Sequence, residues 1–140
     1  MDKIDSFKKN YFFLSNFYPV NIVWDGRLYK SSEHLYQASK TNDDVEHMWV
    51  RSAPTAGIAK KRGQLVTVVP NWDKIKIIVM HQTPMAKFQQ HDDLKEKLLE
   101  TGDALLEEGN NWGDTYWGTV NGVGEKMLGK LLMGVREHLK

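Results

Sequence analysis

Three side chains that can carry acid–base or nucleophilic chemistry recur at helical spacing between residues 32 and 40. Glu33, Gln37 and Lys40 are spaced i, i+4 and i+7, so a helix here places a carboxylate, an amide and an amine on one stripe. Ser32 stands where an N-cap residue belongs, and Glu33 then lies at the positive end of the helix dipole. At this point two interpretations stay open: a solvated, salt-bridged face, or the reactive face of a site.

The elements around this helix follow from turn and periodicity signals. Asp25-Gly26 lies between β-prone runs and predicts a hairpin with a type I′ turn that leads into the helix. The aromatic segment 6–18 is expected to be extended and to feed a loop at Ser15-Asn16. Further helices are expected over 43–51, 54–63, 71–88, 92–101 and 124–140, and a short strand over 104–108.

Two of these helices carry specific expectations. In the helix over 43–51, the sequence predicts that Val45, Met48 and Trp49 form the inner face. In the helix after Asn71, Pro84 is expected to cause a kink or a restart, because proline has no amide hydrogen to donate. Together the elements predict a mainly α protein with short strands and hairpins, folded as one domain over residues 1–140.

Residues 109–124 are rich in glycine, asparagine and tryptophan, a composition that does not form a regular helix. A loop of this kind in a compact domain is usually functional, since glycine lets the backbone approach a ligand and tryptophan offers a flat surface for stacking. A surface hairpin with tryptophan packed on the core is the alternative. The basic run 60–62 has two interpretations as well: a favourable contact with the end of its helix, or a phosphate contact.

Composition excludes several classes of site. The chain has no cysteine, so we expect no disulfide. None of its five histidines lies four residues from another, so we expect no metal site. Its net charge of +1 predicts no broad basic field. Neither a nucleotide-binding glycine motif nor a serine-hydrolase elbow is present, and we expect no cofactor. No signal peptide or membrane-spanning run is evident, so a cytoplasmic protein is expected.

What remains is a set of carboxylates, amides, a lysine and tryptophans, which suits cleavage at an anomeric carbon. In such a reaction the sugar gains positive charge in the transition state, and a carboxylate stabilises that charge. Glu33 and Asp114 are the candidates for this role.

Sequence motifs over about residues 11 to 137 support this interpretation. Residues 13–19 read F-L-S-N-F-Y-P, and residues 29–40 read Y-x-S-S-E-H-x-Y-Q-A-x-K. Shorter blocks follow in order at 59–60, 72–73, 79–80, 87–88, 98–102, 114–118 and 128–136. In order and spacing these motifs resemble those of the YbiA-like or NADAR family.

The resemblance implies a compact, mainly helical fold and N-glycosidase chemistry on ribose-phosphate or ADP-ribose compounds. Described members of the family cleave unstable intermediates of riboflavin biosynthesis or remove ADP-ribose from guanine. The expected partner is therefore a small nucleotide or ADP-ribose-type substrate, or an ADP-ribosylated nucleic acid. A non-catalytic module that binds ADP-ribose or NAD is the alternative, and the leaving base and the oligomeric state stay open.

The resemblance also assigns site residues. Glu33 and Asp114 are expected to stabilise charge or to activate water, and Lys40 is expected either to contact the substrate or to act as a nucleophilic amine. Glu33 is further expected to be exposed and to matter more for rate than for stability. The resemblance places Asn16, Trp72 and Trp117 in the pocket together with Glu33, Lys40 and Asp114. The other candidate substrate contacts, which do not come from the family pattern, are Ser15, Gln37, Trp112, Gly118 and Lys126. At Lys126 the family usually has asparagine, which predicts an altered substrate preference.

Overall fold

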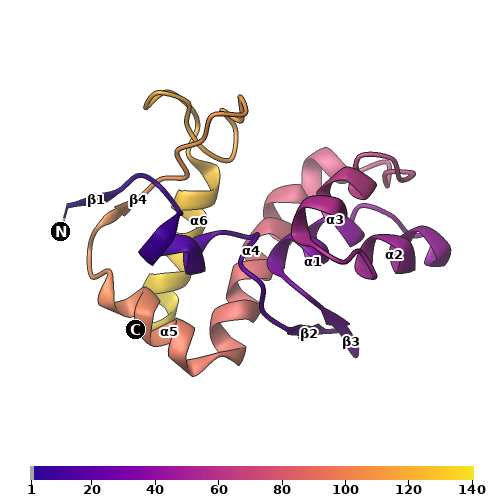
Figure 1. The fold of residues 1–140 in the computed structure, drawn as a ribbon, viewed down its shortest axis with the longest axis horizontal. Coiled ribbons are helices and arrows are strands. Elements are labelled where there is room, and N and C mark those ends of the chain that lie inside the picture. The colour runs from indigo at the N-terminus through magenta and orange to yellow at the C-terminus, as the bar shows by residue number, and fades with distance from the viewer. Residues whose placement is uncertain (1) are drawn as a thin grey trace. The chain divides into compact units, whose positions relative to one another are not determined.

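The computed structural model describes residues 2–140, and the chain divides into two units (Figure 1). The central unit comprises residues 16–90, and the terminal unit comprises residues 2–15 together with 91–140. Helices dominate both units and the strands are short, which confirms the predicted fold class. The single-domain boundary over residues 1–140 stays a prediction.

The central unit begins with a two-stranded antiparallel hairpin formed by β2 (Ile22–Trp24) and β3 (Arg27–Tyr29). Asp25 and Gly26 between them have φ angles of 51° and 74°, which confirms the predicted type I′ turn. The helix α1 (Ser32–Ala38) follows. Its N-cap is Ser31 and not Ser32 as predicted, because Ser31 keeps an extended backbone and its side chain accepts a hydrogen bond from the His34 backbone amide.

Three further helices pack around α1, and all seven residues of α1 are buried. They are α2 (Asp44–Arg51), α3 (Ala56–Gly63) and α4 (Trp72–Gln90), and Figure 1 shows α2 and α3 beside α1. Close approach of α3 depends on Gly63, since a Cβ atom there would lie 2.8 Å from Cβ and Cδ of Gln37. The central position of α1 is therefore what removes its side chains from solvent.

The orientation of α2 differs from the prediction. Val45, Met48 and Trp49 are 79%, 53% and 40% exposed, so the predicted inner face points outward. The opposite face turns inward because its side chains find partners there: Val50 is fully buried, and the ring of His47 hydrogen-bonds Tyr29 Oη at 2.8 Å. On this helix, hydrogen bonding outweighs the apolar periodicity.

The helix α4 runs through Pro84 without a break, so of the predicted kink or restart the restart is wrong and the kink stays a prediction. A proline at this position cannot donate to the carbonyl of Met80, four residues earlier. The Thr83 hydroxyl supplies a donor instead and bonds the Met80 carbonyl oxygen at 3.2 Å. Thr83 thus compensates for the amide hydrogen that Pro84 lacks.

The terminal unit contains a two-stranded parallel sheet of β1 (Lys3–Ile4) and β4 (Leu105–Leu106). The segment that was predicted to be extended includes a 3-10 helix, η1 (Lys9–Leu14). The helices α5 (Asp92–Glu100) and α6 (Met127–Leu139) pack on each other, and α6 also packs on β4. Among residues 2–140, no helix combines the length and the apolar character that crossing a membrane requires.

Candidate functional site

The predicted carboxylate Glu33 is buried rather than exposed, with 6% of its surface accessible. Gln37 Nε2 donates a hydrogen bond of 2.6 Å to Glu33 Oε2, which confirms that the two residues share a face of α1. The backbone amide of Glu33 donates to the carbonyl oxygen of Asn16 at 2.9 Å, and Asn16 Nδ2 in turn contacts Met80 Sδ at 3.0 Å. The structure thus joins three of the predicted site residues, Asn16, Glu33 and Gln37, in one hydrogen-bonded set.

Two polar atoms of α1 are buried without a hydrogen-bond partner among the described residues. They are Gln37 Oε1 and Ser32 Oγ, and both residues are less than 5% exposed. Leaving a polar atom buried and unpaired costs about 1–3 kcal/mol, so such atoms in a folded protein call for an explanation.

Lys40 follows the end of α1 and is half-buried. Its Nζ atom lies 5.8 Å from the centre of the Tyr36 ring. Burial lowers the pKa of the Lys40 amine, the negative charge of Glu33 raises it, and the positive charge of Lys60 lowers it, with a net decrease. The amine is therefore neutral more often than an exposed lysine, which nucleophilic chemistry requires.

Trp72 is the first residue of α4 and is buried against the Tyr36 ring, with a centroid separation of 5.3 Å. The segment before it is tied to the end of α1, because the Val69 amide donates to the Lys40 carbonyl oxygen at 2.8 Å. Lys40 and Trp72 are thus both placed around Tyr36. Packing alone explains the position of Trp72, and its stacking on a substrate stays a prediction.

Asp114, the second predicted carboxylate, belongs to the terminal unit and organises its own loop. Its Oδ1 atom accepts hydrogen bonds from the backbone amides of Tyr116 and Trp117 at 3.1 and 2.9 Å. The Asn110 side chain bonds both the amide and the carbonyl of Asp114. At Gly118 a Cβ atom would overlap the backbone carbonyl oxygen of Glu108 and lie 2.9 Å from Asn110 Nδ2, so only glycine fits there. These contacts are structural, and a catalytic role for Asp114 stays a prediction.

The remaining predicted substrate contacts in the terminal unit differ in exposure. Trp112 is 54% exposed, and Trp117 is half-buried with its ring 4.7 Å from the Tyr116 ring in a T-shaped contact. Ser15 ends η1 and is half-buried. Of these side chains, Trp112 is the most accessible to a planar ligand.

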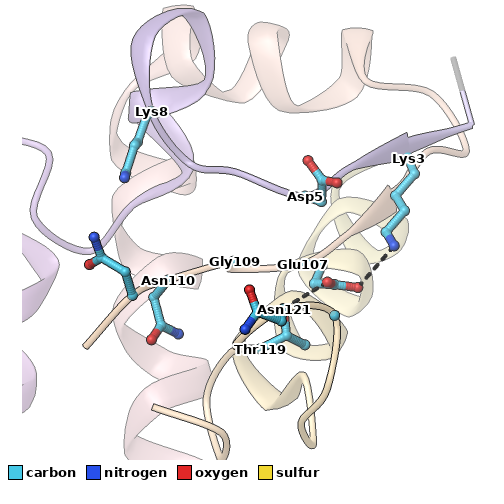
Figure 2. Close-up of a pocket in the computed structure, with 10 residues that line it drawn as sticks. Lys3, Asp5, Lys8, Glu107, Gly109, Asn110, Thr119 and Asn121 are labelled. Atoms are coloured by element: carbon cyan, nitrogen blue, oxygen red, sulfur yellow. Dashed lines mark hydrogen bonds and ion pairs between the residues drawn. The ribbon is translucent and has the colours of Figure 1, made fainter. Parts of the chain in front are cut away.

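Lys126 pairs with Glu107, a residue that lines a polar hollow of the terminal unit with a volume of about 340 Å³ (Figure 2). Its Nζ atom is 3.3 Å from Oε1 of Glu107, a buried residue that also pairs with Lys3 at 3.4 Å. Burial alone would raise the pKa of Glu107, but the Thr119 hydroxyl, Lys126 and Lys3 outweigh it and lower that pKa. The amine of Lys126 therefore has an ion-pair partner within its own unit.

His34 is a positioning residue that the sequence patterns did not indicate. Its ring is 1% exposed, with Nδ1 2.7 Å from Ser31 Oγ and Nε2 2.9 Å from the carbonyl oxygen of Ala53. The carbonyl can only accept, so Nε2 carries the hydrogen and donates it, and burial lowers the pKa of the neutral ring. The bonds hold the start of α1 to the segment after α2. A serine three residues before a histidine at a helix start was the available signal.

Metal ligation finds no support in the described residues, since no three histidine or carboxylate side chains gather as a metal would require among residues 2–140. The predicted absence of a metal stays an expectation for experiment.

Sequence similarity to known proteins extends over both units of the chain. Residues 4–140 match the sequence profile of the NADAR domain. The N-glycosidase YbiA of Escherichia coli (strain K12) is 38% identical over 128 residues, covering 89% of this chain and 79% of YbiA. The N-glycosidase Npun_R5314 of Nostoc punctiforme is 36% identical over 132 residues, covering 90% of this chain and 84% of that protein.

The fold comparison agrees with the sequence matches. The NMR structure of E. coli YbiA has a TM-score of 0.86 to this chain at 35% identity and covers 98% of this chain and 83% of that one. A riboflavin biosynthesis protein of Vibrio vulnificus, VVA0006, is 38% identical over 135 residues, covering 94% of this chain but 36% of the longer protein.

Proposed function

Because the chain belongs to the NADAR domain family and is an N-glycosidase, we propose that it hydrolyses the N-glycosidic bond of an ADP-ribose-like or ribosylamino-pyrimidine substrate. The buried, hydrogen-bonded Glu33 beside an amine of lowered pKa is the observation that supports this most strongly. Relatives named N-glycosidases favour catalysis over the alternative of a non-catalytic binding module.

Glu33 has the properties that cleavage at the anomeric carbon needs. When the base leaves with the electron pair of the glycosidic bond, positive charge develops on the ribose. A carboxylate that is already oriented stabilises this charge without reorganisation during the reaction. The bond from Gln37 Nε2 and the backbone bond to Asn16 hold Glu33 in a defined position before substrate binds. Glu33 is proposed to stabilise the charge or to activate the attacking water.

Lys40 has the properties of a nucleophilic amine. When the base leaves with the electron pair of the glycosidic bond, the neutral amine adds to the positively charged anomeric carbon and loses a proton; opening of the ribose ring, with a proton taken up by the ring oxygen, then gives the imine. Water later hydrolyses the imine and returns the amine and the free sugar. The lowered pKa of Lys40 increases the fraction of neutral amine, so the rate is expected to rise with pH through that pKa, below 10.5.

The other predicted site residues are kept as proposed substrate contacts, each within its own unit. Asn16, Gln37 and Trp72 belong to the central unit, and Ser15, Trp112, Trp117, Gly118 and Lys126 belong to the terminal unit. Asp114 is kept as the second catalytic carboxylate, with Oδ1 engaged in the loop. VVA0006 is named a riboflavin biosynthesis protein, which supports ribosylamino-pyrimidines as one substrate class to test.

The first experiment measures base release from a panel of N-ribosides and ADP-ribosyl compounds by chromatography. Glu33→Gln keeps the size of the side chain and an acceptor for Gln37, so we expect a near-parental melting temperature and a loss in kcat of about 10²–10⁴-fold. The matched control is Glu125→Gln, an exposed carboxylate, for which kcat should not change. Full activity of Glu33→Gln on every substrate that the parent cleaves would reject Glu33 as the catalytic carboxylate.

The second experiment traps the imine. Borohydride added during turnover should fix a ribose-containing fragment on the protein, and peptide mapping should place it on Lys40. Lys40→Arg keeps the positive charge but forms no imine, so trapping and most activity should be lost. Lys60→Arg is the control, because it keeps the neighbouring positive charge while Lys40 is unchanged. If Lys40→Arg works nearly as well as the parent, Lys40 is only an electrostatic contact.

A further inference from the structure

The outward face of α2 has the character of an interaction surface. Val45, Met48 and Trp49 form an exposed apolar stripe, and Leu28 on β3 is 47% exposed. Arg51 connects the two elements, since Nη1 donates to the Leu28 carbonyl oxygen at 3.3 Å and Nη2 contacts Met48 Sδ at 3.3 Å. An amphipathic helix normally turns its apolar stripe toward the core, so a stripe facing solvent indicates a surface that another molecule covers.

Arginines gather at one end of this stripe. The chain has four arginines; Arg51 is the last residue of α2, and Arg62, on α3, contacts Trp49 near the same end of α2. The Arg62 guanidinium lies 5.2 Å from the centre of the Trp49 ring and donates to the Trp49 carbonyl oxygen at 2.8 Å. Neither guanidinium forms an ion pair with a carboxylate in the part of the chain that the structure describes, residues 2–140. Neither positive charge is therefore neutralised by a carboxylate within this part of the chain.

Carboxylates occupy the other end of the stripe. Asp43 caps α2 through a bond of 2.8 Å from the Glu46 amide, and Asp44 begins the helix; both are exposed. Within residues 2–140, Asp44 forms no ion pair with a lysine or an arginine. Asp44 and Arg51 are seven residues apart, so they lie on the same flank of the stripe, two turns or about 10 Å from each other along the axis.

We propose that the stripe of α2 pairs with the same stripe of a second copy of this chain, with the two helices antiparallel across a two-fold axis. In this arrangement the second helix runs in the opposite direction, and the flank that carries Asp44 and Arg51 in one copy meets the same flank of the other copy. Asp44 of each copy therefore lies beside Arg51 of the other. Met48, midway along the stripe, lies near the axis, where its flexible side chain can adapt to its symmetry mate.

The charge pattern selects a second copy over other occupants. A stripe with carboxylates at one end and guanidinium groups at the other is complementary to its own reversed image. A uniformly acidic peptide or a nucleic acid strand would place its negative charges against Asp43 and Asp44 as well as against the arginines. Because the stripe spans a helix of eight residues, the paired area is small and the dimer is expected to be weak and concentration-dependent.

The test is the oligomeric state of the full chain, measured by sedimentation velocity from about 5 µM to about 500 µM, a range that brackets weak association. The parent is expected to shift toward twice the mass of one chain as its concentration rises. Val45→Glu changes a side chain that is 79% exposed and should stay monomeric. Ile78→Glu, at a 58% exposed site on α4, is the matched control and should dimerise like the parent.

A pair of charge reversals tests the antiparallel arrangement itself. Asp44→Lys and Arg51→Glu should each be monomeric alone, because residues 44 and 51 then carry the same sign of charge and repel each other at both places where they meet across the two-fold axis. When the two variants are mixed, both contacts join opposite charges, and a heterodimer should form; its formation also shows that both variants are folded. A parent that stays monomeric throughout the range, a dimeric Val45→Glu, or a mixture that does not associate overturns the proposal.

Discussion

Gly63→Ala tests whether α3 positions Glu33 through Gln37. A Cβ atom at residue 63 would lie 2.8 Å from Cβ and Cδ of Gln37 and still closer to Oε1. Non-bonded carbon atoms normally rest about 3.5–4.0 Å apart, so the new methyl group overlaps Gln37 by roughly 0.7–1.2 Å. Gln37 Cβ is fixed to the backbone of α1 and cannot rotate away. The helices must therefore separate, and the amide of Gln37 must move relative to Glu33.

The expected effect has two parts. Overpacking of a tight contact costs about 1–3 kcal/mol of unfolding free energy. A misplacement of about 1 Å at a catalytic group lowers the rate by about 10²-fold, so we expect kcat to fall by this factor. Gln37→Ala alone should also lower kcat, because Glu33 then loses its side-chain donor. Combined with Gly63→Ala it should add little, since both changes disrupt the same contact.

The assay combines urea unfolding with steady-state kinetics on the best substrate of the panel. Gly57→Ala is the matched control on the same helix, because its Cβ atom would meet nothing closer than Thr55 Oγ1 at 3.9 Å. This control should keep full activity and gain about 0.5–1 kcal/mol from the higher helix propensity of alanine. If Gly63→Ala is as stable and active as Gly57→Ala, the positioning of Glu33 by α3 is refuted.

Four further outcomes are expected. Activity should survive a chelator, and a loss that a divalent ion restores would show a metal requirement. Lys126→Asn should keep the fold, since asparagine tolerates the left-handed backbone found there, and should raise the pKa of Glu107, measurable by NMR titration. Thr83→Val should lower the free energy of unfolding by about 1–3 kcal/mol in the parent protein. In a Pro84→Ala background the same change should cost little, because the new backbone amide of residue 84 can replace the hydroxyl. Equal costs in both backgrounds would contradict the compensation by Thr83. Burial lowers the pKa of Lys87 to about 7, so the folded form loses this proton near neutrality, while the unfolded form holds it to about pH 10. The free energy of unfolding should therefore rise by a few kcal/mol between these two pH values. Lys87→Met should abolish this dependence of the unfolding free energy on pH.

The sequence by itself determined the features that depend on a few neighbouring residues. Asp25-Gly26 specifies its turn because the positive φ angles are a local requirement that aspartate and glycine tolerate. The spacing of Glu33 and Gln37 predicted a shared face, which their hydrogen bond confirms. The order and spacing of the motifs identified the family correctly, since these motifs retain the residues of the fold and of its chemistry.

Only the tertiary structure decided which side of each helix is covered. Periodicity shows that α2 has an apolar stripe but carries no information on competing partners, and the bonds of His47 turned that stripe toward solvent. Glu33 reads as a surface carboxylate in isolation and is buried because three helices surround α1. The Thr83 hydroxyl likewise supports α4 across Pro84. The physical reason is that burial and hydrogen-bond satisfaction depend on groups brought together from distant parts of the chain, whereas propensity and periodicity report only on adjacent residues.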